Sequence, residues 1–529
     1  MKTQDRPANE VNPLATTARL RAENGSALVA GLVTLAVLSM LAAATFQTVT
    51  SRFRSNYQTA SWHDALTAAE SGVEYSMARL RSPLTTSGVL TNPLNVPGSL
   101  QSDLATLSAG GSSNNGTVLS DTYNGVSFPR IQLPTLTIPH LGQGSSQYVF
   151  TTTVDAVPRT SLSNSGLNTW YRIRSVGVVP LSGSANVGVQ KYDNMLRKLQ
   201  FRRDSSGALL TQPQAVRTIE VLAKPVTTGS SALFGQTGIN LNNQNVVINS
   251  YDSRSPLTST NGLYDQAKAT QSANVVTDDD LQGNGMPGVI NLSPTGAYVY
   301  GNVATNNTPV AGSTGHVSGT VTQDFYQALP DPPSPATVSN TWSSFSPSSS
   351  TMSTGTLAAP TRYKIGSSGS FSLTGNSTLN ITAPASGEGY VEVWIPGDLT
   401  ISGNGGIVMP PHVHATFYID GNVKISGNGI QNTSLFPVNL TLYGNHDPSV
   451  VQTMTVDGNG QFAGLIYAPN AAVSAKGGGS SGDIYGAIIA NTIFFNGQTS
   501  LHYDTALGDS GAVIDYRIGS WYEDNTLTR

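Results

Sequence analysis

The feature that most constrains this chain is an uncharged stretch between Glu23 and Arg52, which reads SALVAGLVTLAVLSMLAAATFQTVTS over residues 26–51. As an α-helix rising about 1.5 Å per residue, this stretch would be roughly 39 Å long, more than the ~30 Å hydrocarbon core of a bilayer. Arg19 and Arg21 lie shortly before it, and the positive-inside rule places them in the cytoplasm. The sequence therefore predicts one membrane helix that carries a large extracytoplasmic body.

The helical pattern continues beyond the apolar stretch as far as Pro83. One apolar stripe follows helical spacing in this second half: Leu66, Ala69, Val73, Met77 and Leu80. Pro83 ends the helix because proline lacks an N–H and disfavours helix in the residue before it. We therefore predict one continuous helix over residues 26–83, lipid-facing in its first half and amphipathic in its second.

Three alternating runs downstream of the helix predict strands, at residues 147–157, 170–179 and 216–226. In the second run Tyr171, Ile173 and Ser175 share one face, and every intervening side chain lies on the other. A sheet of such strands would bury the apolar stripe of the helix. The sequence predicts an antiparallel β head over this part of the chain, preceded by a polar loop over 84–118.

Composition excludes several classes of function. Only 11% of the residues are charged and the formal net charge is −4, so no basic surface is available to neutralise nucleic-acid phosphates. The chain has no cysteine, which excludes disulfides, thiol catalysis and cysteine-ligated zinc. The 54 glycines and 29 prolines favour turns over further long helices.

The C-terminal half contains two internal repeats. GDLTISGNGGI begins at residue 397 and GNVKISGNGI at 421, and GLIYAPNAAVSAKGGGS begins at 464 and GAIIANTIFFNGQTS at 486. Self-similar strand segments at spacings of twenty-odd residues are typical of parallel β-helix coils. In such a coil Val423 and Ile425 would face inward and Lys424 outward. A β-sandwich with Asn-Gly hairpins is the alternative, since its strands are equally short.

The predicted fold class is α+β: a long N-terminal helix with an antiparallel β head, followed by a mainly β, solenoid-like domain. A run of Pro and Ser interrupts the last domain and predicts a surface excursion or linker. The predicted division is a leader at 1–25, the helix at 26–83, the β head with its loop at 84–228, the solenoid at 229–515 with the excursion at 329–358, and a C-terminal tail at 516–529.

The N-terminal residues resemble a known family. Gly25-Ser26-Ala27-Leu28-Val29, the apolar run and the motif AAESG at residues 68–72 are similar to the N-terminus of PilX-like type IV pilus assembly proteins. The resemblance implies cleavage by a prepilin peptidase between Gly25 and Ser26. Ala30 stands where major pilins carry a glutamate. The segments SYDS (250–253), IYAPNA (466–471) and HYD (502–504), with the proline-rich interruption, resemble a C-terminal domain of other PilX-like proteins, which implies architecture rather than chemistry.

Two groups of polar residues are candidate metal sites. His412 and His414 share one face of a strand, as zinc- or copper-binding imidazoles do, with His446 or His502 as further ligands; surface histidines are the alternative reading. Asp278, Asp279 and Asp280 offer oxygen ligands for Ca²⁺ but lack EF-hand spacing, and a solvated turn is the alternative. We predict no metal, cofactor or catalytic residue from either group.

Glycoside hydrolysis would need two converging carboxylates. Few acids occur in the clearest repeats, and no nucleophile-elbow, phosphate-binding or metalloprotease motif appears. Asp398 and Asp420 flank matching turns, which suggests a role in shaping coil corners. We therefore predict that the chain is not an enzyme.

The main hypothesis is a minor pilin-like or pseudopilin component, structural or adhesive, located in the inner membrane with an extracytoplasmic domain or on the pilus surface. Its expected partners are other pilins, a prepilin peptidase and the membrane, with surface polysaccharide as a further candidate. A stand-alone, membrane-anchored adhesin or carbohydrate-binding protein is the first alternative. A solenoid carbohydrate-active enzyme is the second.

Overall fold

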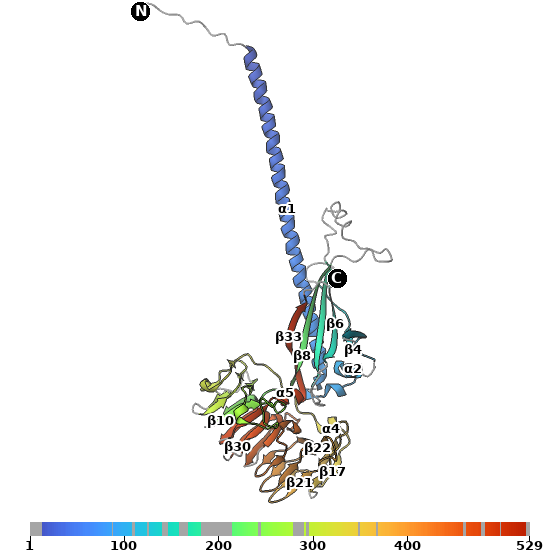
Figure 1. The fold of residues 1–529 in the computed structure, drawn as a ribbon, viewed down its shortest axis with the longest axis vertical. Helices are drawn as coiled ribbons and strands as arrows, with labels where there is room; N and C mark the ends of the chain where they lie inside the picture. Colours follow the sequence, from blue (N-terminus) through green and yellow to red (C-terminus); the bar gives the residue numbers. More distant parts are fainter. Residues whose placement is uncertain are drawn as a thin grey trace, which may run out of the picture.

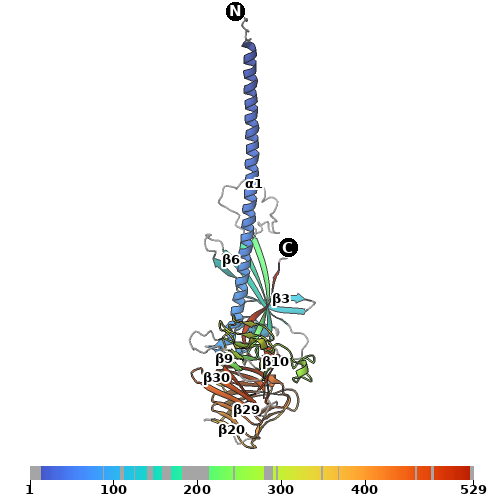
Figure 2. The same cartoon turned by 90° about the vertical axis from the view of Figure 1, so that its left-hand side faces the viewer.

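The computed structural model shows a long helix, a β-sheet head and a β-rich body that follow one another along the molecule (Figure 1). A second view, turned by 90°, gives the same arrangement (Figure 2). The structure describes residues 13–86, 88–107, 112–123, 126–139, 147–157, 168–180, 214–241, 245–278, 290–292, 296–346, 350–366, 369–458, 462–477, 482–497 and 499–524.

Helix α1 runs without interruption from Pro13 to Arg81, over 69 residues. Proline at a first helical position costs no hydrogen bond, because that N–H has no intrahelical partner. At the other end Pro83 lies in a short 3₁₀ turn, Ser82–Leu84, where the α-helix has already stopped. The predicted continuous helix is confirmed, and its helical backbone also includes the second half of the predicted leader.

The head is one antiparallel sheet with strands in the order β3-β4-β6-β7-β8-β33 and with β5 paired to β6. Its strands are β3 (Thr117–Tyr123), β4 (Val126–Gln132), β5 (Leu136–Pro139), β6 (Gln147–Val157), β7 (Trp170–Pro180), β8 (Gln214–Thr227) and β33 (Val513–Asp524). The three strands predicted from alternation are β6, β7 and β8, and the side chains of Tyr171, Ile173 and Ser175 are buried as expected. Ala69, Val73, Met77 and Leu80 of α1 pack in the same core.

Two segments of the head differ from the sequence-based prediction. The predicted polar loop contains helix α2 (Leu100–Leu107), whose leucines enter the head core. It also contains a short hairpin of β1 (Thr85–Thr86) and β2 (Val89–Leu90). The predicted C-terminal tail is wrong for residues 516–524, because these residues belong to β33, which pairs with β8.

The body is a solenoid of parallel strands, dominated by one 20-stranded sheet. The strands of its first part are β9 (Leu233–Leu241), β10 (Val246–Tyr251), β11 (Val275–Thr277), β12 (Ile290–Leu292), β13 (Ala297–Val299), β14 (Val303–Ala304), β15 (Ala311–Gly312) and β16 (Val321–Thr322). Because the strands pair in parallel, the sandwich alternative is wrong.

The second part starts at the opposite end of the body. Its large-sheet strands are β17 (Ser343–Phe345), β19 (Thr361–Ile365), β20 (Phe371–Leu373), β22 (Gly389–Ile395), β23 (Leu399–Ile401), β25 (Val413–Ile419), β26 (Val423–Ile425), β28 (Leu440–Tyr443), β29 (Gln452–Gly458), β30 (Phe462–Gly477), β31 (Ile484–Gly497) and β32 (Leu501–Asp504). A four-stranded sheet holds β18 (Thr351–Met352), β21 (Thr378–Ile381), β24 (Gly406–Met409) and β27 (Ile430–Asn432). Helix α5 (Leu507–Ser510) leads back to the head.

Both predicted repeats are adjacent coils. Ile401 pairs with Ile425 between β23 and β26, and Gly464 pairs with Gly486 between β30 and β31. Val423 and Ile425 are buried while Lys424 is exposed, as predicted. Residues one repeat apart therefore occupy equivalent positions, which is why the sequence pattern recurs.

The strand order shows that the chain enters and leaves the solenoid in its middle. From β9 the coils advance to β16 at one end, and from β17 at the other end they return to β31, which pairs with β9. The chain must therefore cross the length of the body between β16 and β17. Residues 323–342, which we call the strap, make this crossing and include α4 (Pro335–Val338).

The strap lies on the outer face of the large sheet. Phe325 packs edge-on against Phe234 of β9, with ring centroids 5.5 Å apart. The Tyr467 hydroxyl donates a hydrogen bond to the Pro330 carbonyl at 2.7 Å. At the far end Trp342 packs edge-on against Trp394 of β22. Within the predicted excursion over 329–358, residues 329–342 belong to this surface strap, whereas the later residues contain the solenoid strands β17 and β18.

Candidate functional site

The first half of α1 projects from the body and is apolar on all sides. Side chains from Val29 to Val49 are exposed. Among the described residues, one helix, Val29–Leu84, is long and apolar enough to cross a membrane. A helix that is apolar all round requires an apolar environment such as lipid or other helices. Gly25 and Ser26 lie within α1, and their cleavage remains a prediction.

The second half of α1 lies unusually close to the sheet because each side of the interface contributes a glycine at a point of close contact. A Cβ on Gly177 of β7 would overlap the Ala65 carbonyl oxygen and lie 2.5 Å from the Ala69 nitrogen. A Cβ on Gly72 would overlap Ser175 Oγ and lie 2.7 Å from Thr152 Oγ1. The small residues of the motif AAESG therefore have a structural explanation, since only small side chains let helix and sheet pack this closely.

Two backbone connections and a strand contact join the head to the solenoid. The head strand β8 leads into β9, and the solenoid strand β32 leads through α5 back to β33. In addition, the Leu90 N–H of β2 donates to the Asp331 carbonyl of the strap at 2.8 Å, and the Asp331 N–H donates to Gly88. The body is thus held at its middle rather than at one end.

His412 and His414 both face Glu388. His412 Nδ1 lies 3.0 Å from Glu388 Oε1, and His414 Nε2 lies 3.2 Å from Oε2. Burial lowers the pKa of His414, whose ring stacks on Tyr390. Burial acts to raise the pKa of Glu388, but the two histidines outweigh it and the pKa is lowered. No group of three or more His, Asp or Glu side chains in the described ranges is arranged to hold a metal ion.

The other two histidines have separate partners. His446 Nδ1 lies 3.3 Å from Asp420 Oδ1, and the nearby carboxylate raises the pKa of His446. His502 is buried, with Nδ1 2.6 Å from Asn249 Oδ1 and its ring stacked on Tyr264. The structure therefore does not bring His446 or His502 together with His412 and His414 in one site.

The segments SYDS and HYD meet in the fold, because β10 pairs with β32 and places Tyr251 opposite Asp504. Asp504 is fully buried, and its Oδ1 accepts hydrogen bonds from the N–H groups of Ser253 and Ala506 at 3.0 and 3.1 Å. Burial raises the pKa of Asp504. Its Oδ2 and the Tyr251 hydroxyl are buried without a hydrogen-bond partner.

An ion-pair cluster covers this junction. Arg254 binds Asp252 and Asp509 at 2.8 Å each, and so ties the solenoid strand β10 to helix α5 beside the head. Charge-assisted hydrogen bonds of this kind fix geometry. The residues of SYDS and HYD therefore fasten the solenoid where the chain leaves it for the head, which is a structural role.

The carboxylates of the repeats also have structural partners. Asp398 Oδ1 accepts the Asn422 N–H of the next coil at 2.7 Å, as expected for a corner residue. Asp420 Oδ2 instead accepts the indole N–H of Trp394 at 2.8 Å. Asp279 and Asp280 of the predicted acidic turn lie outside the described residues.

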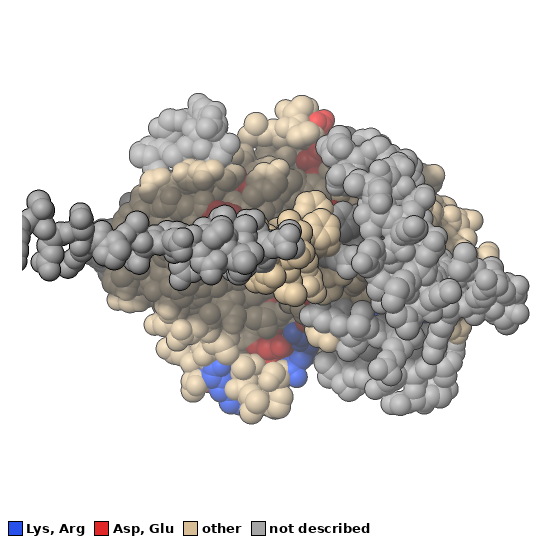
Figure 3. All heavy atoms as spheres, turned by 90° about the horizontal axis from the view of Figure 1, so that it is seen from above, with Lys and Arg blue, Asp and Glu red and all other residues tan. Residues whose placement is uncertain are grey.

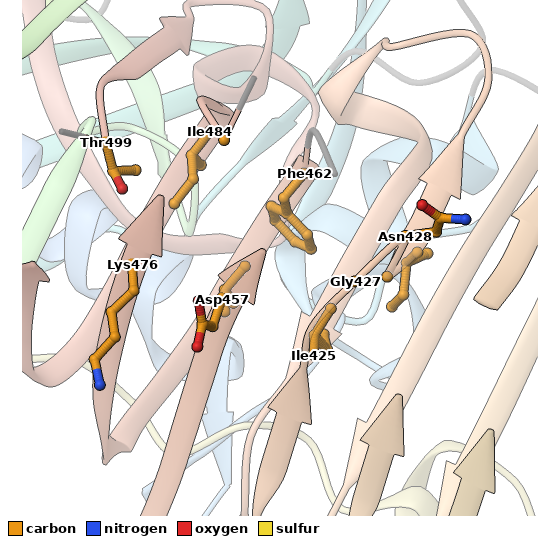
Figure 4. A pocket seen from close by; sticks show the side chains of 12 residues that line it. Ile425, Gly427, Asn428, Asp457, Phe462, Lys476, Ile484 and Thr499 are labelled. Carbon is orange, nitrogen blue, oxygen red and sulfur yellow. The ribbon is translucent and has the colours of Figure 1, made fainter. Parts of the chain in front are cut away.

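Two of the hollows on the described surface differ greatly in size. A cavity of about 20 Å³, enough for one water molecule, lies between the coil corners and is flanked by Asp457 and Lys476 on neighbouring strands (Figure 4). A groove of about 780 Å³ separates the solenoid from the head, lined by Arg81, Asp324, Phe325, Asp515 and Arg517 among others.

Few charged side chains are visible among the described atoms seen from above (Figure 3).

Comparison with known protein families matches residues 339–510 to a domain of unknown function (DUF7305). The match covers about a third of the chain and corresponds to the second part of the solenoid, from the end of the strap to α5. No curated protein and no solved structure matches the chain. The match thus supports the presence of a recurrent C-terminal domain and assigns it no activity.

Proposed function

We propose that this chain is a minor pilin-like or pseudopilin component of a type IV pilus or a related envelope assembly, with a structural or adhesive role. The observation that carries the proposal is α1: one helix whose first half is exposed and apolar and whose second half is buried against an antiparallel sheet. This division suits a subunit that waits in a membrane and packs its helix among others in a fibre. The solenoid is then the part displayed to the surroundings.

In this proposal the partners are other pilins, the inner membrane and a prepilin peptidase that cuts between Gly25 and Ser26. The body would act by its surface and not by catalysis; turnover of a polysaccharide by the purified chain would contradict that part. Surface polysaccharide remains a candidate ligand, because the outer faces of solenoids are where such folds usually make contacts.

Mass spectrometry of the mature N-terminus tests the proposal. We expect the wild-type chain to begin at Ser26 and a Gly25→Val variant to retain residue 1. Gly31→Ala is the matched control, because it changes a glycine of the same helix that has open space around it. A wild-type chain that keeps its original N-terminus while retained in membranes would refute cleavage.

A tethered, stand-alone adhesin is the second candidate, and the exposed parallel sheets of the body favour it. Co-purification distinguishes these two candidate functions. A pilin-like subunit is expected to co-purify with other pilins after membrane cross-linking, whereas a tethered adhesin would be recovered without them.

A further inference from the structure

The groove between the head and the solenoid is walled by residues from both bodies. The head contributes Arg81, at the end of α1, and residues of β33, whereas the solenoid contributes residues of β14 and β16 and the start of the strap. Its volume of about 780 Å³ lies within the roughly 300–1,000 Å³ range of small-molecule sites, which often form where two domains meet. The groove is therefore large enough to hold a ligand.

Contacts between the head and the strap hold the two walls of the groove in place. Arg517 of β33 donates a hydrogen bond from Nη2 to Gln327 Oε1 at 2.8 Å, and its guanidinium carbon lies 5.8 Å from the Phe325 ring centre. The Gln327 N–H in turn donates to Asp278 Oδ1 at 3.1 Å. The groove is therefore shaped before any ligand enters, which lowers the entropic cost of binding.

The charges that line the groove cancel one another. Arg81 and Arg517 are positive, and Asp324 and Asp515 are negative. Arg81 Nε lies 2.7 Å from Asp515 Oδ1, so this pair is already neutralised. A cleft concentrates charged ligands only when its own charges are mainly of one sign. The groove therefore gives no net attraction to a phosphate, sulfate or carboxylate group and favours a ligand without net charge.

The same charged side chains can still form hydrogen bonds with a ligand. Within the described part of the chain, Arg81 uses Nε for Asp515 and Nη2 for the Tyr516 carbonyl, and it keeps the N–H donors of Nη1. Asp324 is exposed and offers a carboxylate that accepts hydrogen bonds. An apolar ligand would cover such groups without pairing them, which is costly. The ligand is therefore expected to be polar as well as neutral.

Tyr326 adds an aromatic ring to this polar lining. The strap alternates here as an extended segment does, with Phe325 and Gln327 turned toward the molecule and Asp324 and Tyr326 exposed. Tyr326 lines the groove and is nevertheless 73% exposed. Tyrosine offers an apolar ring face together with a hydroxyl group that forms hydrogen bonds. Its ring is therefore available to a ligand that has both an apolar and a polar side.

We infer that the groove between head and solenoid binds a neutral oligosaccharide, with Tyr326 as the ring on which a sugar unit stacks. A sugar ring has an apolar C–H face, which packs on an aromatic ring, and hydroxyl groups that both donate and accept hydrogen bonds. Tyr326 supplies the aromatic face, Asp324 the acceptor and Arg81 the donors. The inference deepens the proposed function, because it names the class of saccharide that the displayed part of the chain would bind.

Binding of the full-length protein in detergent to a panel of immobilised oligosaccharides tests the inference. The panel holds neutral oligosaccharides built from hexoses and N-acetylhexosamines, each beside a sulfated or uronic acid counterpart of the same length. We expect the protein to bind at least one neutral member without any requirement for a charged group. Binding to no neutral member, or to charged members alone, overturns the inference.

Variants of two tyrosines then test whether the groove is the binding site. Tyr326→Ala is expected to weaken binding of the neutral member about tenfold or more, as truncation of an aromatic anchor commonly does. Tyr522→Ala is the matched control, because Tyr522 of β33 is 62% exposed and is not among the residues that line the groove. Both side chains are exposed, so an unchanged Tm is expected for each variant. Wild-type affinity in Tyr326→Ala, or an equal loss in Tyr522→Ala, overturns the inference.

The mature N-terminus of the same protein keeps this inference apart from the proposed function. Chains that begin at Ser26 and bind no neutral oligosaccharide would refute the saccharide site alone. Uncut chains that bind one through Tyr326 would refute the pilin-like assignment and support the saccharide site.

Discussion

Gly177→Ala is expected to separate α1 from the head sheet. The added Cβ would overlap the Ala65 carbonyl oxygen, lie 2.5 Å from the Ala69 nitrogen and lie 3.1 Å from the Ala68 Cβ. Optimal contacts between heavy atoms lie at about 3.5–4.0 Å, so the helix must move by about 1 Å. The two nearest opposing atoms belong to the backbone and cannot rotate away.

Overpacking of this kind costs about 1–3 kcal/mol, and the rigid backbone on the helix side favours the upper end. For a domain of this size about 1 kcal/mol lowers the Tm by about 2–4 °C, so a cost of about 3 kcal/mol predicts a loss of about 6–12 °C. Thermal unfolding of the full-length protein in detergent measures the Tm. Hydrogen exchange of β7 then assigns the change to the head.

The control is Gly366→Ala, whose Cβ would meet open space and whose Tm is expected to match the wild type. If Gly177→Ala and Gly366→Ala both melt within about 1 °C of the wild type, the close approach of helix and sheet is not what holds the head together. Faster hydrogen exchange in the solenoid rather than in β7 would contradict the reasoning in the same way.

Three further perturbations test the solenoid. Asp420 raises the pKa of His446, so this pair stabilises the fold fully below about pH 6.5. The stabilisation is lost as the pH rises through the raised pKa. The Tm difference between the wild type and Asp420→Asn should therefore shrink at alkaline pH. Burial raises the pKa of Asp504, which means that the buried charged carboxylate destabilises the fold at pH 7. Asp504→Asn should therefore raise the Tm at pH 7 and raise it less near pH 4. A lower Tm of the variant at pH 7 would contradict this. Tyr467→Phe leaves the Pro330 carbonyl without its donor at a cost of about 1–3 kcal/mol, expected to appear as faster hydrogen exchange of the strap with little change in the head.

Local patterns in the sequence predicted most elements correctly. The alternation at 147–157, 170–179 and 216–226 corresponds to β6, β7 and β8, and the repeats at 397 and 421 are neighbouring coils. These predictions were correct because the burial pattern of each element depends on residues close to it in the sequence. The prediction of a polar loop over 84–118 was wrong at α2, where three leucines within eight residues form one buried helix face.

The histidine pair illustrates the limit for candidate sites. The spacing of His412 and His414 predicted that both share one face of a strand, but His412 lies in the turn before β25 with a left-handed backbone. The spacing also gave no information on Glu388, which lies one coil earlier and contacts both rings. Only the register of neighbouring coils brings that carboxylate between the two rings. The strand β33 was likewise missed, because its partner β8 lies almost 300 residues earlier in the chain and no local pattern links the two.

The amino-acid sequence was enough to predict a membrane-length helix, an amphipathic continuation and a repetitive parallel body, since charge, periodicity and repeats are properties of nearby residues. The complete fold was needed to show where distant segments meet: the strap on the outer face of the large sheet, β33 beside β8, and β31 beside β9, where Thr237 and Asn491 form a hydrogen bond across 254 positions. Such pairings depend on complementary surfaces that exist only once the coils have stacked. The physical reason is that long-range contacts must offset the loss of chain entropy together, so no single segment encodes them.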